Sequence, residues 1–216
     1  PTAFTLVQTV SPNPTISGGR STVNFAAVAD SWRDVRVRVR WPTTTPTVTS
    51  CSTDNFAIRP DVISGFVASN NTRTTAGLAN VLNSTAFGAL LHNAGRPFSI
   101  RSNAVNAAGS PAVTTNYSGS PLATLTACGP GSGFEACTPT QAALTLTTTF
   151  AAGVLASDAA SYNDVGSFNL QLIDDDFASV DNGDSSLAER RIASAVIAVG
   201  RFVPDNFDVA FNLPVF

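Results

Sequence analysis

The densest group of side chains that could do chemistry in this 216-residue chain is an acidic run that begins at residue 174. Asp174-Asp-Asp176 is followed closely by Asp181-Asn-Gly-Asp184. Calcium takes about six to eight oxygen ligands, and loops rich in Asp, Asn and Gly can supply them. We therefore predict a candidate calcium site formed by Asp174, Asp176, Asp181 and Asp184. The spacing differs from that of helix–loop–helix calcium sites, so a solvated acidic loop at the end of a sheet is the alternative.

Groups that could support enzymatic catalysis are sparse. His92 is the only histidine, and its context, Leu-Leu-His-Asn-Ala-Gly, favours a turn or a surface position. Nucleophilic triads need a base beside the nucleophile, and glycosidases need two facing carboxylates, for which the sequence offers no convincing pair. The absence of lysine removes Schiff-base chemistry and P-loop phosphate binding. We predict a chain that is not an enzyme and that has no cofactor other than the calcium considered above.

The cysteines favour one disulfide bond. Cys128 and Cys137 bracket Gly-Pro-Gly-Ser-Gly-Phe-Glu-Ala, a loop that can close into a disulfide. Such a bond would stabilise the fold by about 2–3 kcal/mol. Free thiols are the alternative, and a metal site would need four ligands at suitable spacing. Cys51 is left over, either free or bonded to a partner outside this segment.

A ladder of arginines is the remaining candidate binding surface. In residues 35–41, valines and Trp41 alternate with Arg36, Arg38 and Arg40, which indicates a strand with one apolar and one basic face. The basic face could bind nucleic acid or an anionic glycan. The net charge of −3 and the pI near 4.9 instead favour a solvated face, so we expect no nucleic-acid partner and a buried valine face.

The composition is that of an extracellular β-protein. Charged residues make up 12% of the chain, against about 25% in an average protein. No apolar run reaches the ~18 residues that a membrane helix needs, so we expect no membrane insertion. The chain opens on Pro1, without an initiator methionine or signal-peptide pattern, and we interpret it as a processed or excised piece of a longer protein.

The pattern of strands and prolines predicts three parts. Residues 1–52 should contain three strands of a preceding sandwich module and a Thr/Pro linker. Residues 53–200 should form an immunoglobulin-like antiparallel β-sandwich. Residues 201–216 should hold the opening strand of a following module, because Asp205-Asn-Phe resembles Asp54-Asn-Phe.

Within 53–200, Tyr162 to Leu172 is the strongest structural signal. Phe168, Leu170 and Leu172 alternate with Asn169 and Gln171, as in a strand with one buried face. A tyrosine just before such a strand is typical of the tyrosine corner of immunoglobulin-like sandwiches, so we take Tyr162 and Gly166 as a structural motif. Further strands are predicted at 98–104, 122–126, 144–150 and 192–199, the last of them buried on both faces, and one or two helical turns at 78–91.

Four stretches carry a family resemblance. They are Cys51–Pro60, Ala94–Ile100, Tyr162–Phe168 and Val199–Phe207, and together they resemble a domain of unknown function in MshQ-like proteins. Those are large secreted proteins encoded with the MSHA type IV pilus machinery of Gram-negative bacteria. The resemblance implies a pilus-associated, adhesin-like β-protein at the cell surface, and it supplies no catalytic residues.

Three functions remain open from the sequence. The leading hypothesis is a non-enzymatic extracellular structural or adhesive module that contacts neighbouring domains. A carbohydrate-binding module is an alternative, with Trp32 as the candidate contact to surface glycans. The other alternative is a subunit of a head-to-tail filament, in which the C-terminal segment of one copy adds as a strand to the N-terminal sheet of the next.

Overall fold

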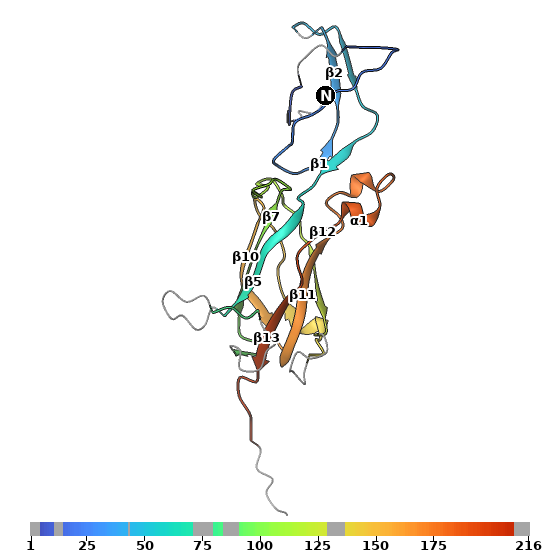
Figure 1. The fold of residues 1–216 in the computed structure, drawn as a ribbon. Coiled ribbons are helices and arrows are strands. Elements are labelled where there is room, and N and C mark those ends of the chain that lie inside the picture. Colours follow the sequence, from blue (N-terminus) through green and yellow to red (C-terminus); the bar gives the residue numbers. More distant parts are fainter. Residues whose placement is uncertain are drawn as a thin grey trace, which may run out of the picture.

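The computed structural model describes residues 5–10, 15–42, 44–70, 80–83, 91–128 and 137–209. Two packed β-sheets form an elongated body, and a smaller β unit built from the N-terminal residues lies at one pole (Figure 1). The C-terminal segment leaves the body at the opposite pole (Figure 1).

The first sheet of the body is antiparallel throughout, with the spatial order β5-β7-β10-β9. β7 lies in its interior, where every residue is buried or half-buried, and the alternation of side chains along the strand directs Phe98, Ile100 and Ala104 into the core. The predicted strand at 98–104 is confirmed. The strands are β5 (Val62–Ser69), β7 (Phe98–Val105), β10 (Val154–Tyr162) and β9 (Leu144–Thr145).

The second sheet is built around β11, which pairs with β8 on one side and with β12 and β13 on the other. The short β6 then adds to β13 in parallel. The two sheets reproduce the ABED and CFG order of an immunoglobulin constant-type sandwich, so the predicted fold class is confirmed. The strands are β8 (Leu122–Thr126), β11 (Gly166–Asp174), β12 (Ile192–Ala193), β13 (Ile197–Val203) and β6 (His92–Asn93).

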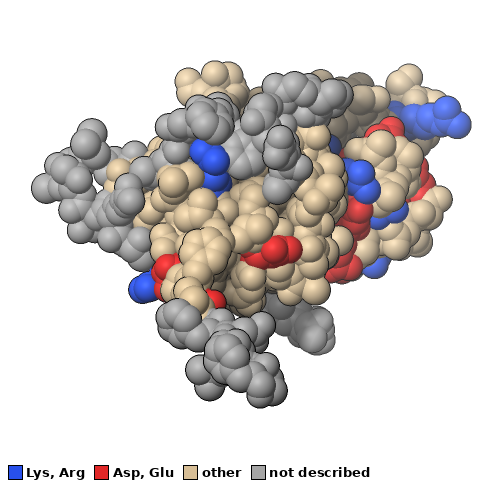
Figure 2. Space-filling view, turned by 90° about the horizontal axis from the view of Figure 1, so that it is seen from below, with Lys and Arg blue, Asp and Glu red and all other residues tan. Residues whose placement is uncertain are grey.

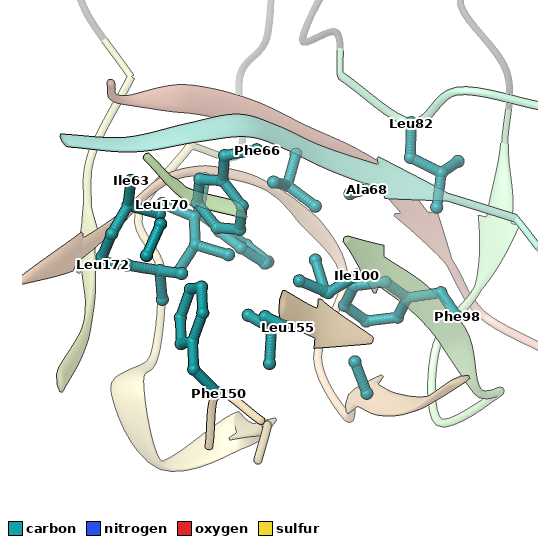
Figure 3. Close-up of a cluster of buried hydrophobic side chains, with 14 of the residues drawn as sticks. Ile63, Phe66, Ala68, Leu82, Phe98, Ile100, Phe150, Leu155, Leu170 and Leu172 are labelled. Atoms are coloured by element: carbon teal, nitrogen blue, oxygen red, sulfur yellow. The ribbon is translucent and has the colours of Figure 1, made fainter. Parts of the chain in front are cut away.

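The core lies between these sheets and is rich in aromatic rings. Phe168, Leu170 and Leu172 are fully buried, as their alternation predicts. The ring of Phe168 stacks on Phe202 with centroids 5.7 Å apart, and Tyr162 packs 4.7 Å from Phe168. Burial of each such ring contributes about 1.5–3 kcal/mol. Figure 3 shows the apolar side chains that converge from the strands of both sheets.

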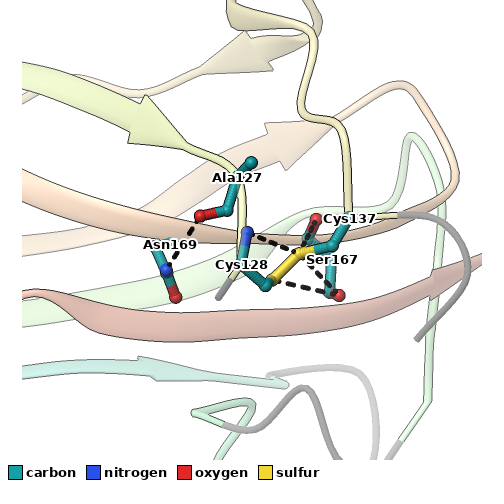
Figure 4. The surroundings of a disulfide bond; sticks show 5 residues. All are labelled: Ala127, Cys128, Cys137, Ser167 and Asn169. Atoms are coloured by element: carbon teal, nitrogen blue, oxygen red, sulfur yellow. Dashed lines mark hydrogen bonds between the residues drawn. A yellow bond between two sulfur atoms is a disulfide. The ribbon is translucent and has the colours of Figure 1, made fainter. Parts of the chain in front are cut away.

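The disulfide between Cys128 and Cys137 is present, with the Cα atoms 5.4 Å apart. It connects the chain just beyond β8 to the segment that leads into β9, and it lies against Ser167 of β11 (Figure 4). Asn169 donates from Nδ2 to the carbonyl of Ala127 at 3.2 Å beside it. The predicted bond is therefore confirmed, and it holds the connection between β8 and β9 against β11 of the second sheet.

The N-terminal unit differs from the prediction. The single strand expected at 35–41 is two strands that separate at Arg36 and Val37, and no strand is assigned in residues 5–10 or 21–29. Two two-stranded antiparallel sheets result, because each half of the expected strand pairs with a different partner. β1 (Trp32–Val35) pairs with β4 (Phe56–Ile58), and β2 (Arg38–Trp41) pairs with β3 (Val48–Cys51).

This pairing also moves the boundaries between the parts. Because β4 pairs with β1, residues 53–58 belong to the N-terminal unit, and the sandwich begins with β5. At the other end β13 continues to Val203, so residues 201–203 close the sandwich instead of opening another module. Residues 204–209 form no strand, and 210–216 lie outside the described residues.

Three further local predictions need correction. The expected strand 192–199 is interrupted at residues 194–196, where Val196 is 54% exposed, so it is not buried on both faces. The strand expected at 144–150 is regular only at 144–145, although Phe150 is buried. The helical turns predicted at 78–91 are not found where the structure describes these residues. Residues 80–83 form isolated β-bridges to Ser69 and Gly200, and Leu91 is not helical. The rest of this stretch lies outside the described residues.

Among the residues that the structure describes, helical structure consists of single turns near the sheets' ends. They are the 3₁₀ turns η1 (Gln141–Ala143) and η2 (Ser179–Asp181) and the helix α1 (Leu187–Arg190). α1 begins with a capping box in which Ser186 and Glu189 exchange hydrogen bonds. In the described part of the chain, no helix has the length and apolar character needed to span a bilayer.

Candidate functional site

The most unusual surface of the described chain is one face of the β2–β3 sheet, which we name the β2–β3 apolar face. Val39 and Trp41 point to this side from β2, and Val48 is the partner of Trp41 across the two strands. Their exposed fractions are 64%, 61% and 60%. The prediction that valines and Trp41 are buried is therefore wrong, because no described layer of the protein covers this side.

The rest of the N-terminal unit provides little core. Among the described residues between 5 and 59, only Ser31 is buried. Leu6, Ile16 and Phe25 are also more than half exposed. Monomeric proteins rarely leave contiguous apolar surface of this kind open, and larger patches mark interaction sites. In the described residues, no second layer covers the apolar side chains of this unit.

The opposite face of the β2–β3 sheet is polar. It carries Arg40 together with Arg38, Thr49 and Cys51, by the alternation of side chains along β2 and β3. Cys51 is exposed and forms no disulfide. Nearby, Arg36 donates from Nη1 to the carbonyl oxygen of Thr53 at 2.9 Å. The polar face thus carries two arginines of the predicted ladder, of which Arg40 is exposed and Arg38 is half-buried.

Hydrogen bonds hold the N-terminal unit on the sandwich. The backbone N–H of Ser31 donates to Oδ1 of Asn116 at 2.8 Å, and the N–H of Thr115 donates to Oδ1 of Asp30 at 3.0 Å. On the other side of the junction, the N–H of Ala57 donates to Oδ2 of Asp181 at 3.0 Å. Because these hydrogen bonds lie on two sides of the junction, they fix the orientation of the N-terminal unit on the sandwich.

A buried polar network lies below this junction. The hydroxyl of Tyr117 donates to Oδ2 of Asp174 at 2.6 Å, and both residues are buried. Burial, and then the hydrogen bond to Asp174, raises the pKa of Tyr117 well above its ordinary value. Oδ1 of Asp174 accepts from the backbone N–H groups of Asp176 and Phe177, both at 2.9 Å. Asp174 thereby shapes the loop on which the N-terminal unit rests.

Arg33 of β1 connects the unit to that loop. Its guanidinium carbon lies 4.4 Å from the centroid of the Phe177 ring, and Nη1 is 3.5 Å from Oδ2 of Asp176. Cation–π contacts contribute about 0.5–2 kcal/mol, depending on exposure. The acidic run that the sequence singled out therefore has a visible structural role at the junction.

The four candidate calcium ligands are not gathered. In the described part of the chain no three His, Cys, Asp or Glu residues form a group that could hold a metal ion. Asp174 faces Tyr117, Asp176 faces Arg33, and Asp181 accepts from Ala57, while the N–H of Asp184 donates to the carbonyl of Asp181. The carboxylates of Asp174, Asp176 and Asp181 thus have three different partners in this structure.

The other predicted site residues have structural positions. Tyr162 is buried at the end of β10, and its hydroxyl accepts from the backbone N–H of Thr140 at 3.2 Å. It resembles a tyrosine corner in bonding to backbone, but it ends one strand and does not begin the next. Gly166 has φ of 105° where β11 begins, a conformation that favours glycine.

Trp32 and His92 both face inward. Trp32 is half-buried, and its buried Nε1 has no hydrogen-bond partner among the described residues, so its contact with a glycan stays a prediction. His92 is 1% exposed and makes edge contacts with Phe98 and Phe202, while its Nε2 lies 3.0 Å from the carbonyl oxygen of Arg96. The expectation of a surface histidine is wrong, because β6 inserts beside β13.

Comparison with known proteins yields no identification: no family model matches the chain, and neither a curated protein nor a solved structure matches it. The resemblance to MshQ-like proteins therefore remains a prediction. The structural features that bear on function are the β2–β3 apolar face and the junction that orients it.

Proposed function

We propose that this chain is a non-enzymatic extracellular structural module, of the kind that builds stalks or adhesive surface proteins. The observation that carries the proposal is the combination of a complete sandwich with an N-terminal unit that presents an uncovered apolar sheet face. A module of this form is suited to joining a neighbour, because the sandwich supplies rigidity and the open face supplies binding energy.

Two further features support an extracellular location. The disulfide between Cys128 and Cys137 persists in oxidising compartments and is rare in the cytosol. Charged residues make up only 12% of the chain, and the visible pole in Figure 2 shows few charged side chains among uncharged ones. The resemblance to MshQ-like surface proteins points the same way, and a pilus-associated role forms part of this proposal.

Surface labelling tests the proposal. Antibodies against the sandwich should label intact cells that produce the protein, and protease added to intact cells should remove the label. Non-reducing electrophoresis of the native protein should show the Cys128–Cys137 bond in most molecules. Label that appears only after the cells are broken, with both cysteines reduced, would refute an extracellular module.

A further inference from the structure

The C-terminal segment has the pattern of a strand that lacks a sheet. From residue 206 onward the odd-numbered residues are all apolar, whereas half of the even-numbered residues are polar, which is the pattern of a strand with one buried face. In the described part of the segment, Phe207 and Val209 are 84% and 75% exposed. The odd-numbered set, which we name the apolar parity, is Phe207, Val209, Phe211, Leu213 and Val215, and the even-numbered set is Asn206, Asp208, Ala210, Asn212, Pro214 and Phe216.

The start of this segment is anchored to the sandwich. Asp205 accepts hydrogen bonds from Nη2 and Nε of Arg96 at 2.9 and 3.1 Å and from Asn93. The guanidinium and amide hydrogen bonds lower the pKa of Asp205, so the carboxylate stays charged and bound near neutral pH. Residues 206–209 therefore leave the sandwich from a fixed point.

That point lies far from the chain's own β2–β3 apolar face. Asp205 is held beside β6, whereas the N-terminal unit contacts Thr115, Asn116 and Asp181 at the other end of the sandwich. Figure 1 shows the two at opposite poles with the body between them. Because the segment that begins at Asp205 and the β2–β3 apolar face lie at opposite poles, they can meet between two molecules but not within one.

We propose that residues 205–216 of one copy add as a strand to the outer edge of β3 in a second copy, with their apolar parity on the β2–β3 apolar face. All four residues of β3 are exposed, and no described strand pairs with its outer edge. Extended segments that add to a free edge gain backbone hydrogen bonds from the edge and side-chain contacts from one face. Pro214 cannot donate to such a ladder, so the pairing should end before it.

This partner deepens the structural role proposed above and rests on it. Since the donating and accepting surfaces differ, the contact is head-to-tail, and repeated contacts give an open filament instead of a closed dimer. Charge favours the same contact, because the segment carries Asp208 on the parity that would face the side of Arg40.

Cys51 provides a face-specific test, because it lies on β3 with its side chain on the polar side. Cysteines introduced by Asp208→Cys and Asn212→Cys would share that side, and one of them should form an intermolecular disulfide with Cys51 under mild oxidation with copper-phenanthroline. Val209→Cys and Phe211→Cys place the thiol on the other side and should cross-link at least tenfold less. The same variants in a Cys51→Ser background should give no ladder.

Assembly itself is measured by sedimentation velocity of the 216-residue chain. We expect concentration-dependent linear assemblies that disappear when residues 207–216 are removed, a deletion that keeps Asp205 and its partners. Trp41→Ser should also lose assembly while the sandwich melts unchanged. Cross-links within one chain, equal cross-linking from both parities, or a truncated chain that still assembles would each overturn the proposal. Surface labelling is independent of these results, so the partner and the proposed location can fail separately.

Discussion

Replacing Tyr117 with phenylalanine removes one atom from the centre of the junction. The Tyr117 hydroxyl is the partner of Asp174 Oδ2 at 2.6 Å, and no other hydrogen bond to that oxygen is seen in the described residues. Phenylalanine keeps the ring contacts to Phe150 and Phe177, with centroids at 5.2 and 5.1 Å. The substitution therefore isolates the hydrogen bond from the packing around it.

The expected cost follows from the burial of Asp174, which is 4% exposed. A buried hydrogen bond to a charged group contributes about 1.5–3 kcal/mol, and loss of one partner leaves the other desolvated without compensation. We expect Tyr117→Phe to lower the free energy of unfolding by about 2–3 kcal/mol. For a chain of this size, that corresponds to a fall in Tm of about 5–10 °C.

Tyr162→Phe is the matched control. Its hydroxyl is equally buried but accepts from the neutral backbone N–H of Thr140 at 3.2 Å, so its loss should cost only about 0.5–1.5 kcal/mol. Urea denaturation followed by tryptophan fluorescence and circular dichroism gives both values. If Tyr117→Phe costs no more than Tyr162→Phe, the Tyr117–Asp174 bond is not the charged, buried interaction described above.

The pH dependence gives a second check on the same bond. The pKa of Tyr117 is raised in the folded state by burial and by Asp174, so above the ordinary tyrosine pKa of about 10 the unfolded chain loses this proton first. The stability of the wild type should then fall by an additional ~1.4 kcal/mol per pH unit above pH ~10, relative to Tyr117→Phe. Parallel profiles for the two proteins between pH 9 and 11 would contradict the shift.

Three other perturbations test separate parts of the structure. Gly119→Ala would place a Cβ atom on the Tyr117 hydroxyl and the Asp174 carboxylate, and it should lower the free energy of unfolding in urea by about 2–4 kcal/mol. Gly183→Ala, which has open space around it, should be close to neutral, and equal effects of the two substitutions would contradict this packing. Replacing Cys128 and Cys137 together with serine should lower stability by about 2–3 kcal/mol, and dithiothreitol should destabilise the wild type but not this variant. Arg191 lowers the pKa of Asp175 through hydrogen bonds of 2.7 and 2.8 Å, so the wild type should be more stable than Asp175→Asn at neutral pH. Thermal melts should show that this difference in stability shrinks as the pH falls below about 4, because the carboxylate of the unfolded chain is then protonated. A difference that persists at pH 2 would exclude an ionic origin.

Local pattern was sufficient where a strand lies entirely within one sandwich. The alternation in Phe168–Leu172 predicts a half-buried strand, and β11 has that burial because it is central in its sheet, with the other sheet packed on its apolar side. The spacing of Cys128 and Cys137 likewise predicts their bond, since a short loop keeps both ends close. Neither inference needs information from distant segments.

Pattern was insufficient where the outcome depends on distant partners. The acidic run predicts a shared calcium site, which stays a prediction, and nothing in the sequence indicated that Tyr117 and Arg33, at sequence distances of 57 and 143 residues from their aspartate partners, contact two of its carboxylates at the junction. His92 looked like a loop residue, yet pairing of β6 with β13 buries it. Composition gave no sign of either result, because each partner is brought in by the sheet topology.

The β2–β3 apolar face shows where the two kinds of information divide. The amino-acid sequence by itself determined that Val39 and Trp41 lie on one side of a strand and Arg38 and Arg40 on the other, because side chains alternate along any extended chain. It could not determine which side is covered, since burial requires a second layer that comes from elsewhere in the chain or from a partner. Only the tertiary structure showed that the described chain supplies no such layer there, and that the chain beyond β13 leaves the sandwich at the opposite pole.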